Sequence, residues 1–431
     1  MKLKTGILLL ILVLGLNSGR AQIYLYPKGM GLANSYATQS RGADVIGYNP
    51  ANLGMPGNPR FNLAFGLIPF VAPFPSVQIS NSAISPAFLW DHFFTGNYLD
   101  DHAKEQLLSF FPDQGLVLSP LVQTRLLGLS FGRWAVMAGV DFTGAVTVPK
   151  SLFRFALFGN QFGKPITLDA SETEMQAIFS IAVAHGREIK VPAITDYLQR
   201  LAVGGGVKLL IGGGYAGFEN FSVDLTTYHD RIAMEGDVTA RAGAGGFGIA
   251  FDAGVAAQIN DKMAANLAFN NLLGTVGWGF LEAKEKVFKV QVEIPSDQFD
   301  KADSLIDEGI TVESIRDIDG LSSAYPSYLI MGFEYRLLDN LRLFSNYKQY
   351  LTTKIASSVT PILAFGVELH ALPFLPVRTG ISLGGQDKFI WSFGFGLNFT
   401  RYNFDLGFSQ VGGMFNHSRG FAFAMGQSLS F

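Results

Sequence analysis

The sequence predicts an all-β protein, a transmembrane barrel of fourteen antiparallel strands with an N-terminal plug in its lumen. Three observations predict it. Segments after residue 60 alternate between bulky apolar and small or polar residues, the period of a strand with two different surroundings. The chain holds 49 Gly and 38 Phe, but only 16% of its residues are charged. Past residue 22 no run approaches the roughly 20 apolar residues of a membrane helix, so a spanning protein must be a closed barrel.

The first residues have the organisation of a secretory signal peptide. Lysines precede the apolar run 7–16, and the small residues Gly19 and Ala21 follow it. We expect a signal peptide over residues 1–21 and a mature chain that begins at Gln22. A membrane anchor, the alternative, needs a longer apolar core. The chain has no cysteine, which excludes a disulfide scaffold, a cysteine-ligated metal site and a lipoprotein anchor.

Residues 22–57 do not look like strands, although they are apolar. Glycines interrupt them, and Pro cannot donate to a strand ladder. Irregular backbone is tolerated at membrane depth only inside protein. We therefore expect residues 22–57 to form a plug and residues 58–431 to form the barrel. The plug motif is Asn49, Pro50, Ala51, Asn52 and Leu53.

Alternating segments then follow in order along the chain. Their number is even, as single-chain bacterial barrels require. The expected strands cover residues 61–79 (with a Pro-rich bend), 122–131, 134–143, 175–183, 201–211, 247–259, 263–270, 329–335, 341–350, 363–369, 377–383, 389–399, 404–408 and 420–431.

The connections sort into short and long ones. Tight turns at Gly132, Asn260, Asp339, Arg401 and 371–376 all fall at one end, and only 186–200 is long there. The expected extracellular loops lie at the other end, at about 81–120, 149–172, 213–246, 280–326, 351–360, 384–388 and 411–419. A short helix over 100–111, stopped by Pro112, is expected in the first of them. A β-sandwich, the alternative fold, gives no reason for this sorting.

The last strand ends the chain on the aromatic Phe431. This ending resembles the assembly signal of bacterial outer-membrane barrels, and the resemblance implies a place in that membrane with lipid and the barrel assembly machinery as partners. Residues 42–51, which read GADVIGYNPA, resemble the stretch before the first strand of the FadL-like (long-chain fatty-acid transporter) superfamily. There the N-terminal segment folds into the lumen as a plug, and the family also has fourteen strands.

Within that superfamily, residues 246–278, 365–385 and the end strands are most similar to a group of bacterial outer-membrane barrels with PorV-like relatives. The resemblance implies passive passage of a small hydrophobic compound, but no fatty-acid pocket or lateral opening aligns residue by residue. The alternative is a surface scaffold or shuttle whose long extracellular loops bind partner proteins. A transporter is expected to show an apolar tunnel that ends at the plug, and a scaffold a blocked lumen.

Five charged residues lie opposite the apolar positions of their strands, so we expect them to point into the lumen. They are Glu334, Arg336, Lys348, Glu368 and Arg378. A charge that faces lipid at mid-membrane costs about 2–4 kcal/mol, and this pattern avoids that cost. Pairing within the lumen or with the plug is one role for these residues, and contact with a substrate is the other.

Nothing in the sequence predicts catalysis, a metal site or a cofactor. The pattern Gly-x-Gly-x-x-Gly over 243–248 is followed by a strand, whereas a nucleotide site needs a helix there. The histidines show no spacing with a serine and an acid that would make a hydrolase. A net charge of -3 gives no reason to expect nucleic acid. The acidic run 295–319 suits a solvated loop or a cation or partner site.

Overall fold

The computed structural model describes residues 26–65, 75–91, 100–113, 115–170, 173–192, 197–352, 359–385 and 387–431. The predicted signal peptide, residues 1–21, lies outside the described residues, as do residues 22–25 of the expected plug. Across the described ranges, no helix is long and apolar enough to cross a membrane.

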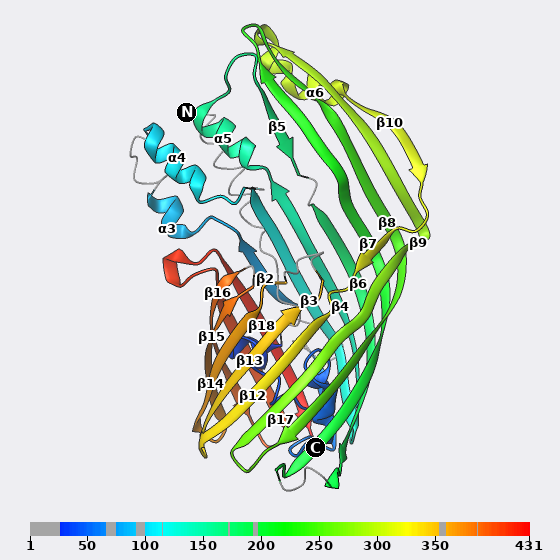
Figure 1. Ribbon diagram of the computed structural model, residues 1–431, viewed down its shortest axis with the longest axis vertical. Helices are drawn as coiled ribbons and strands as arrows, with labels where there is room; N and C mark the ends of the chain where they lie inside the picture. The colour runs from blue at the N-terminus through cyan, green and yellow to red at the C-terminus, as the bar shows by residue number, and fades with distance from the viewer. Residues whose placement is uncertain are drawn as a thin grey trace.

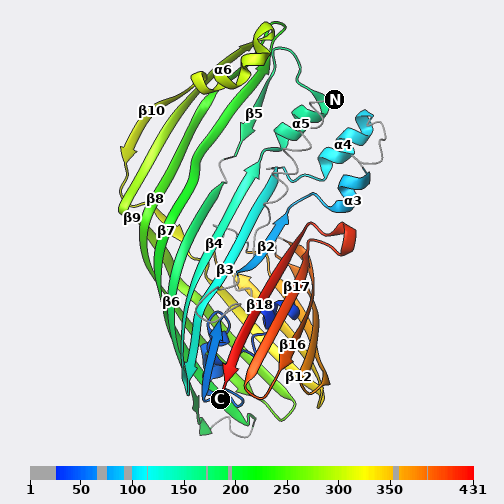
Figure 2. The ribbon, with the colours of Figure 1, turned by 180° about the vertical axis from the view of Figure 1, so that it is seen from behind.

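A single antiparallel sheet closes on itself to form a ring (Figures 1 and 2). Strand β18 (Gly420–Ser430) pairs with β1 (Phe61–Phe65) and β2 (Ser76–Asn81), and both of these pair with β3 (Leu116–Phe131). The remaining ring strands are β4 (Trp134–Val148), β6 (Glu174–Ile189), β7 (Arg200–Thr227), β8 (Arg231–Gln258), β9 (Met263–Pro295), β12 (Tyr328–Leu338), β13 (Leu341–Tyr350), β14 (Ile362–Leu372), β15 (Leu375–Gly384), β16 (Lys388–Asn398) and β17 (Tyr402–Val411).

The described residues form 18 strands, whereas the sequence predicts fourteen. The difference lies in short strands that share a neighbour with a longer one. Strands β1 and β2 both lie between β18 and β3, and β5 (Pro165–Asp169) continues β6 along β7. Along β9 the strands β12, β11 (Ser322–Ala324) and β10 (Ile310–Asp317) follow one another. The short strands therefore add to the count of strands without adding positions around the ring.

Strands β7, β8 and β9, of 28, 28 and 33 residues, rise far beyond the rest of the ring and form a tall wall (Figure 1). The prediction of a glycine-rich loop over residues 213–246 is wrong, because these residues belong mostly to the paired strands β7 and β8. Much of the excursion predicted from 280 is likewise strand β9. The glycines serve packing here: side chains at Gly243 and Gly246 would each lie 2.7 Å from Trp278. Helix α6 (Ala302–Gly309) covers an apolar cluster of the wall that includes Val238, Val292 and Ile294.

Three helices lie at the end of the ring where the long connections are (Figure 2). They are α3 (Pro86–Leu89), α4 (Asp101–Ser109) and α5 (Lys150–Phe158). Asp100 caps α4, its side chain accepting the Ala103 N–H, and Leu107 and Leu108 are buried against the other helices. Helix α4 falls within the stretch where the sequence predicts one.

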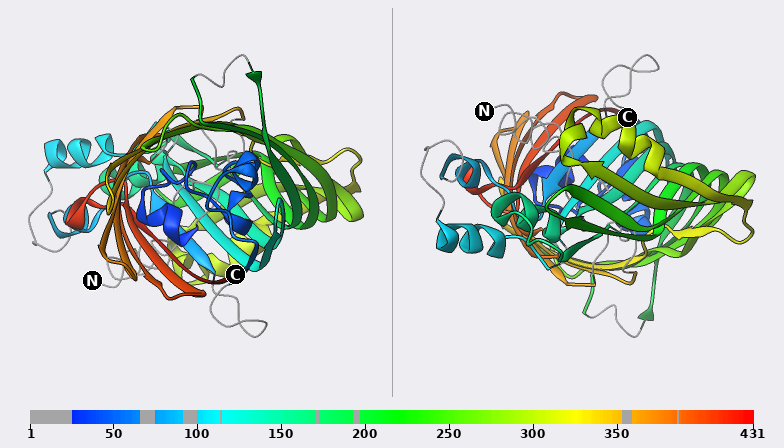
Figure 3. Two further views of the ribbon diagram at one scale, coloured as in Figure 1. Left: turned by 90° about the horizontal axis from the view of Figure 1, so that it is seen from below. Right: turned by 90° about the horizontal axis from the view of Figure 1, so that it is seen from above.

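Residues 26–57, called the N-terminal segment from here on, lie inside the ring, as the views along its axis show (Figure 3, dark blue). They form helix α2 (Pro27–Gly31) and two 3₁₀ turns, η1 (Gly42–Val45) and η2 (Pro50–Gly54). Asn49 caps η2, its side chain accepting the Ala51 N–H, and Pro50 takes the first position, where no amide donor is needed. The fold therefore places an irregular segment where the strands surround it.

The outer face of the ring exposes large apolar side chains. On β16, outward Phe393 is 41% exposed while its neighbour Ser392 is 0% exposed. Other outward side chains that are more than a third exposed are Phe247, Ile249, Phe251, Leu267, Phe269, Met331, Leu363, Phe365, Ile381, Leu383 and Phe421. Phe431 lies against Phe61 of the first strand, with ring centroids 6.1 Å apart. The alternation predicted for these strands is thus observed.

Candidate functional site

Glycines on the inner face of the ring form the seat of the N-terminal segment. A side chain at Gly204 would lie 2.7 Å from the Cα of Ala51, and one at Gly380 would lie 2.6 Å from the carbonyl carbon of Leu32. Elsewhere Gly31 of α2 lies directly on Gly394 of β16. Because these contacts join backbone to backbone, the segment lies closer to the wall than it could if the glycines carried side chains.

The predicted motif Asn49–Leu53 lies at this seat. Asn49 Nδ2 donates to the carbonyl of Val255 on β8 (2.9 Å), and Asn52 Nδ2 donates to Ala37 O (2.7 Å) and Ser40 Oγ (2.8 Å). Ala51 and Leu53 are buried. The motif therefore joins the segment both to the wall and to itself.

The five predicted lumen charges all point inward, but they do not form one site. Arg378 lies between Glu368 and Asp405, 2.7 Å from each. Lys348 lies over the rings of Tyr328 (4.2 Å) and Tyr350 (4.6 Å).

The other two predicted charges, Glu334 and Arg336, lie near the mouth where the chain ends. Glu334 accepts a hydrogen bond from Gln39 of the N-terminal segment (2.7 Å). The main-chain N–H of Arg336 donates to Lys262 O (2.8 Å) in the turn between β8 and β9. Glu368 and Arg378 line a cavity at the same mouth, so of the five charges Lys348 is the one that lies away from it.

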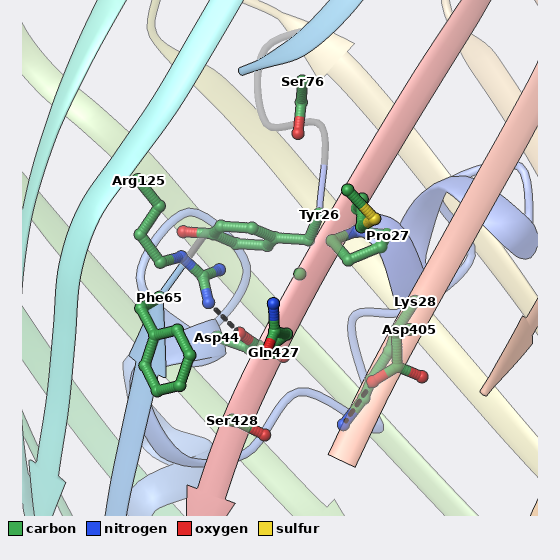
Figure 4. A pocket seen from close by; sticks show the side chains of 12 residues that line it. Tyr26, Pro27, Lys28, Asp44, Phe65, Ser76, Arg125, Asp405, Gln427 and Ser428 are labelled. Atoms are coloured by element: carbon green, nitrogen blue, oxygen red, sulfur yellow. Dashed lines mark hydrogen bonds and ion pairs between the residues drawn. The ribbon is translucent and has the colours of Figure 1, made fainter. Parts of the chain in front are cut away.

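Two further ion pairs tie the N-terminal segment to the wall (Figure 4). Arg125 of β3 donates to Asp44 (2.8 Å) and stacks over Tyr26 (3.9 Å), and Lys28 lies 3.6 Å from Asp405. These side chains line a cavity of about 40 Å³ between the segment and the wall. At roughly 10–15 Å³ per water, the cavity holds a few waters and no larger compound.

A polar layer lies directly above the segment, on the side of the long connections. Buried Lys208 lies 2.9 Å from Asp252, and the side chain also contacts Asn271. Tyr325 donates to Asp141 (2.7 Å). These described residues line the lumen with polar groups, whereas an apolar tunnel ending at the plug was expected for a transporter.

Asp44, Arg125 and Lys208 are interior charges that were not predicted from the sequence. A signal for Lys208 was present, because it lies between the apolar outward residues Val207 and Leu209 of β7. Asp44 had no such signal, since its segment has no strand period. Its partner depends on how that segment folds inside the ring.

Comparisons with known proteins support the fold. Residues 66–245 match the model of a family of unknown function, DUF5723. No curated protein is significantly similar to the sequence.

Solved structures are similar over nearly the whole chain. The toluene transporter TbuX of Ralstonia pickettii is 13% identical with a TM-score of 0.51, and the alignment covers 94% of this chain and 98% of TbuX. The CymD monoaromatic hydrocarbon channel is 12% identical with a TM-score of 0.51, covering 95% and 98%. The deltaS2 mutant of the TodX monoaromatic hydrocarbon channel is 12% identical with a TM-score of 0.50, covering 95% and 100%.

These neighbours are channels and transporters, and at such low identity they establish the fold alone. The resemblance that residues 42–51 and the alternating strands indicated is confirmed at that level. The chain has a FadL-like β-barrel fold.

Proposed function

We propose that this protein is an outer-membrane channel for small hydrophobic compounds and that its N-terminal segment is the plug. The observation that carries the proposal is the closed ring with this segment seated inside it, in a fold shared with hydrocarbon channels. The structure then corresponds to the closed state of the channel. No covalent chemistry is required of any side chain.

The membrane assignment is supported by the two faces of the strands. Strands β12–β18 have 10 or 11 residues, close to the 9–11 that a tilted strand needs to cross a bilayer. Their bulky apolar residues point outward and their charges inward, the arrangement that lipid favours. In this proposal fourteen strand positions surround the lumen, the short turns are periplasmic and the long connections extracellular.

Passage requires the plug to leave part of its seat, because it fills the ring at that level. Its buried residues include Leu32, Val45 and Ile46. The test follows from the absence of cysteine, which makes an engineered disulfide the only one in the chain. A Cβ added at Gly366 of β14 would overlap Ser35 Oγ of the plug, so Ser35→Cys with Gly366→Cys brings two thiols close enough to bond once the side chains adjust.

The locked protein is reconstituted in liposomes, and uptake of labelled toluene is measured before and after reduction. Because toluene also dissolves in lipid, uptake is counted as the excess over protein-free liposomes. We expect this excess only after reduction, and at all times in a version lacking residues 22–57. Ser35→Cys alone is the control, since it cannot lock the plug and adds no atom at Gly366. Equal uptake by the oxidised and reduced double variant would contradict movement of the plug.

A scaffold for partner proteins is the second candidate, and two observations favour it. The plug lies across the lumen below a polar layer, and β7, β8 and β9 have 28, 28 and 33 residues, far more than a crossing needs. If neither the reduced double variant nor the version without residues 22–57 admits toluene, the scaffold becomes the better account.

A further inference from the structure

The mouth of the ring at which the chain ends holds two adjoining cavities, of about 390 and 300 Å³. We call it the short-turn mouth, after the turns at 132–133, 259–262, 339–340 and 399–401. Both cavities are lined by Gln39, Arg41, Gly57 and Arg342. They are as large as sites that hold small molecules, in contrast to the 40 Å³ cavity beside the plug.

A row of charged residues crosses the strands beside these cavities. Arg336 of β12 is the register partner of Arg342 on β13, and Arg342 is that of Glu368 on β14. Like charges directly opposite one another destabilise a sheet. Glu368 does not offset both cations, because it is bound to Arg378 at 2.7 Å.

The remaining carboxylate at the row is Glu334, and it only partly balances the arginines. Its Oε1 lies 4.0 Å from Arg342 and accepts a hydrogen bond from Gln39. The Nε atoms of Arg336 and Arg342 are buried, and neither has a hydrogen-bond partner within the described ranges. Bulk water does not reach these two donors, and a buried donor left unpaired costs about 1–3 kcal/mol.

A third guanidinium faces the same space from the plug. Arg41 Nη1 donates to Thr38 O (2.9 Å) and Ser40 O (2.8 Å), and its Nε donates to Pro56 O (3.0 Å). Three carbonyls thus hold this cation in place at the junction of the two cavities. Backbone carbonyls fix its position without neutralising its charge.

We propose that the short-turn mouth binds a small oxyanion with two or more acidic oxygens, a dicarboxylate or a phosphate. Guanidinium groups are planar and match both chemistries with paired hydrogen bonds. Such a ligand between Arg41, Arg336 and Arg342 meets the parts of the guanidinium groups that line the cavities, balances their charge and screens the two register partners from one another. The site does not depend on passage of any compound through the ring.

Binding is measured on the detergent-purified full chain by calorimetric titration and thermal unfolding. The probes are succinate and inorganic phosphate, with sodium chloride at equal ionic strength as the control. Wild type is compared with Arg342→Gln and Arg336→Gln. Arg133→Gln is the matched variant, because Arg133 is an exposed cation in a turn of the same mouth but does not line the cavities.

We expect one or both anions to raise the melting temperature above the chloride control. Arg342→Gln and Arg336→Gln should each weaken binding by at least about tenfold, the order of a lost hydrogen bond to a charged group, and Arg133→Gln should not. Without ligand, Arg342→Gln should melt higher than wild type, because it removes the opposed like charges. Tighter binding of succinate would indicate a dicarboxylate ligand, and tighter binding of phosphate would indicate a phosphate ligand.

No stabilisation by either anion beyond chloride would overturn the site. An equal loss of binding in Arg133→Gln would also overturn it, by showing that only the overall charge of the mouth matters. Should Arg342→Gln fail to fold, Arg336→Gln tests the same row independently. Because no uptake is measured, these results stand whether or not the channel proposal fails.

Discussion

Replacing Gly204 with Ala tests whether the plug is held in a seat made for it. Gly204 lies on the inner face of β7, and an added Cβ would overlap the backbone of Pro50 and Ala51. The atoms it meets are backbone atoms and not the ends of flexible side chains, so they cannot rotate away. The strand or the plug must move.

The expected size follows from this overlap. Overpacking by one methyl group costs about 1–3 kcal/mol where neighbours cannot yield. Gly205, the next residue, faces outward, and the atom nearest to its added Cβ is Asp252 O at 3.5 Å. Alanine at 205 should be neutral or stabilise the strand by about 0.5–1 kcal/mol, since alanine loses less conformational entropy on folding than glycine does.

The two variants are compared by urea unfolding and by limited proteolysis of the plug in detergent. We expect Gly204→Ala to unfold at lower urea and to expose the plug to protease, while Gly205→Ala resembles wild type. In the liposome assay, Gly204→Ala should also admit more toluene. If the two alanines have the same effect on stability and on cleavage, the seat does not hold the plug.

Two further predictions concern buried charges. Arg378→Ala should destabilise the barrel by about 3 kcal/mol, measured by urea unfolding. This value is the low end of the cost of breaking a buried ion pair. Lys28 remains 3.6 Å from Asp405, so that only Glu368 loses its main partner. An unchanged urea midpoint would contradict the prediction. Burial raises the pKa of Asp387, in the connection between β15 and β16, to about 7. A raised acid pKa means that the folded state binds the proton more tightly, so stability should fall as pH rises from about 4 to 7 and then level off. Asp387→Asn should remove this slope in thermal unfolding, and a slope that persists would assign it to another group.

The sequence predicted which residues of a strand face outward and which face the lumen, because the two faces of a barrel wall have different surroundings. Strand β16 shows this best: Phe393 points outward and Ser392 inward, as the period of two requires. The inward direction of the five lumen charges follows from the same alternation along their strands. These inferences need no knowledge of the neighbouring strands.

The tall wall could not be predicted from composition. Glycine-rich residues 213–246 were read as a loop because Gly weakens an isolated strand. In the structure the ladder between β7 and β8 continues through them, and the missing side chains leave room for Trp278. The glycines therefore make room for a side chain of the neighbouring strand β9, which the local sequence does not show.

The candidate sites depend on register and on the path of the plug, and neither follows from a sequence pattern. Arg336 was singled out but Arg342 was not, although it shares the parity of inward Lys348. Their pairing also depends on a bulge between Arg336 and Leu338, which shifts the register. Arg41 reaches the same mouth only because its irregular segment lies inside the ring.

The most direct test of the account asks which side of a strand touches lipid. Single cysteines at successive positions of β16, including Ser392 and Phe393, are spin-labelled one at a time in liposomes, which the absence of native cysteine makes unambiguous. Collision with oxygen, which concentrates in lipid, and with a water-soluble nickel complex is then measured. We expect oxygen access at Phe393 and the other outward positions, and little at Ser392 and the inward ones. Outward labels that collide with the nickel complex, or no alternation along the strand, would show that the apolar face does not lie in a membrane.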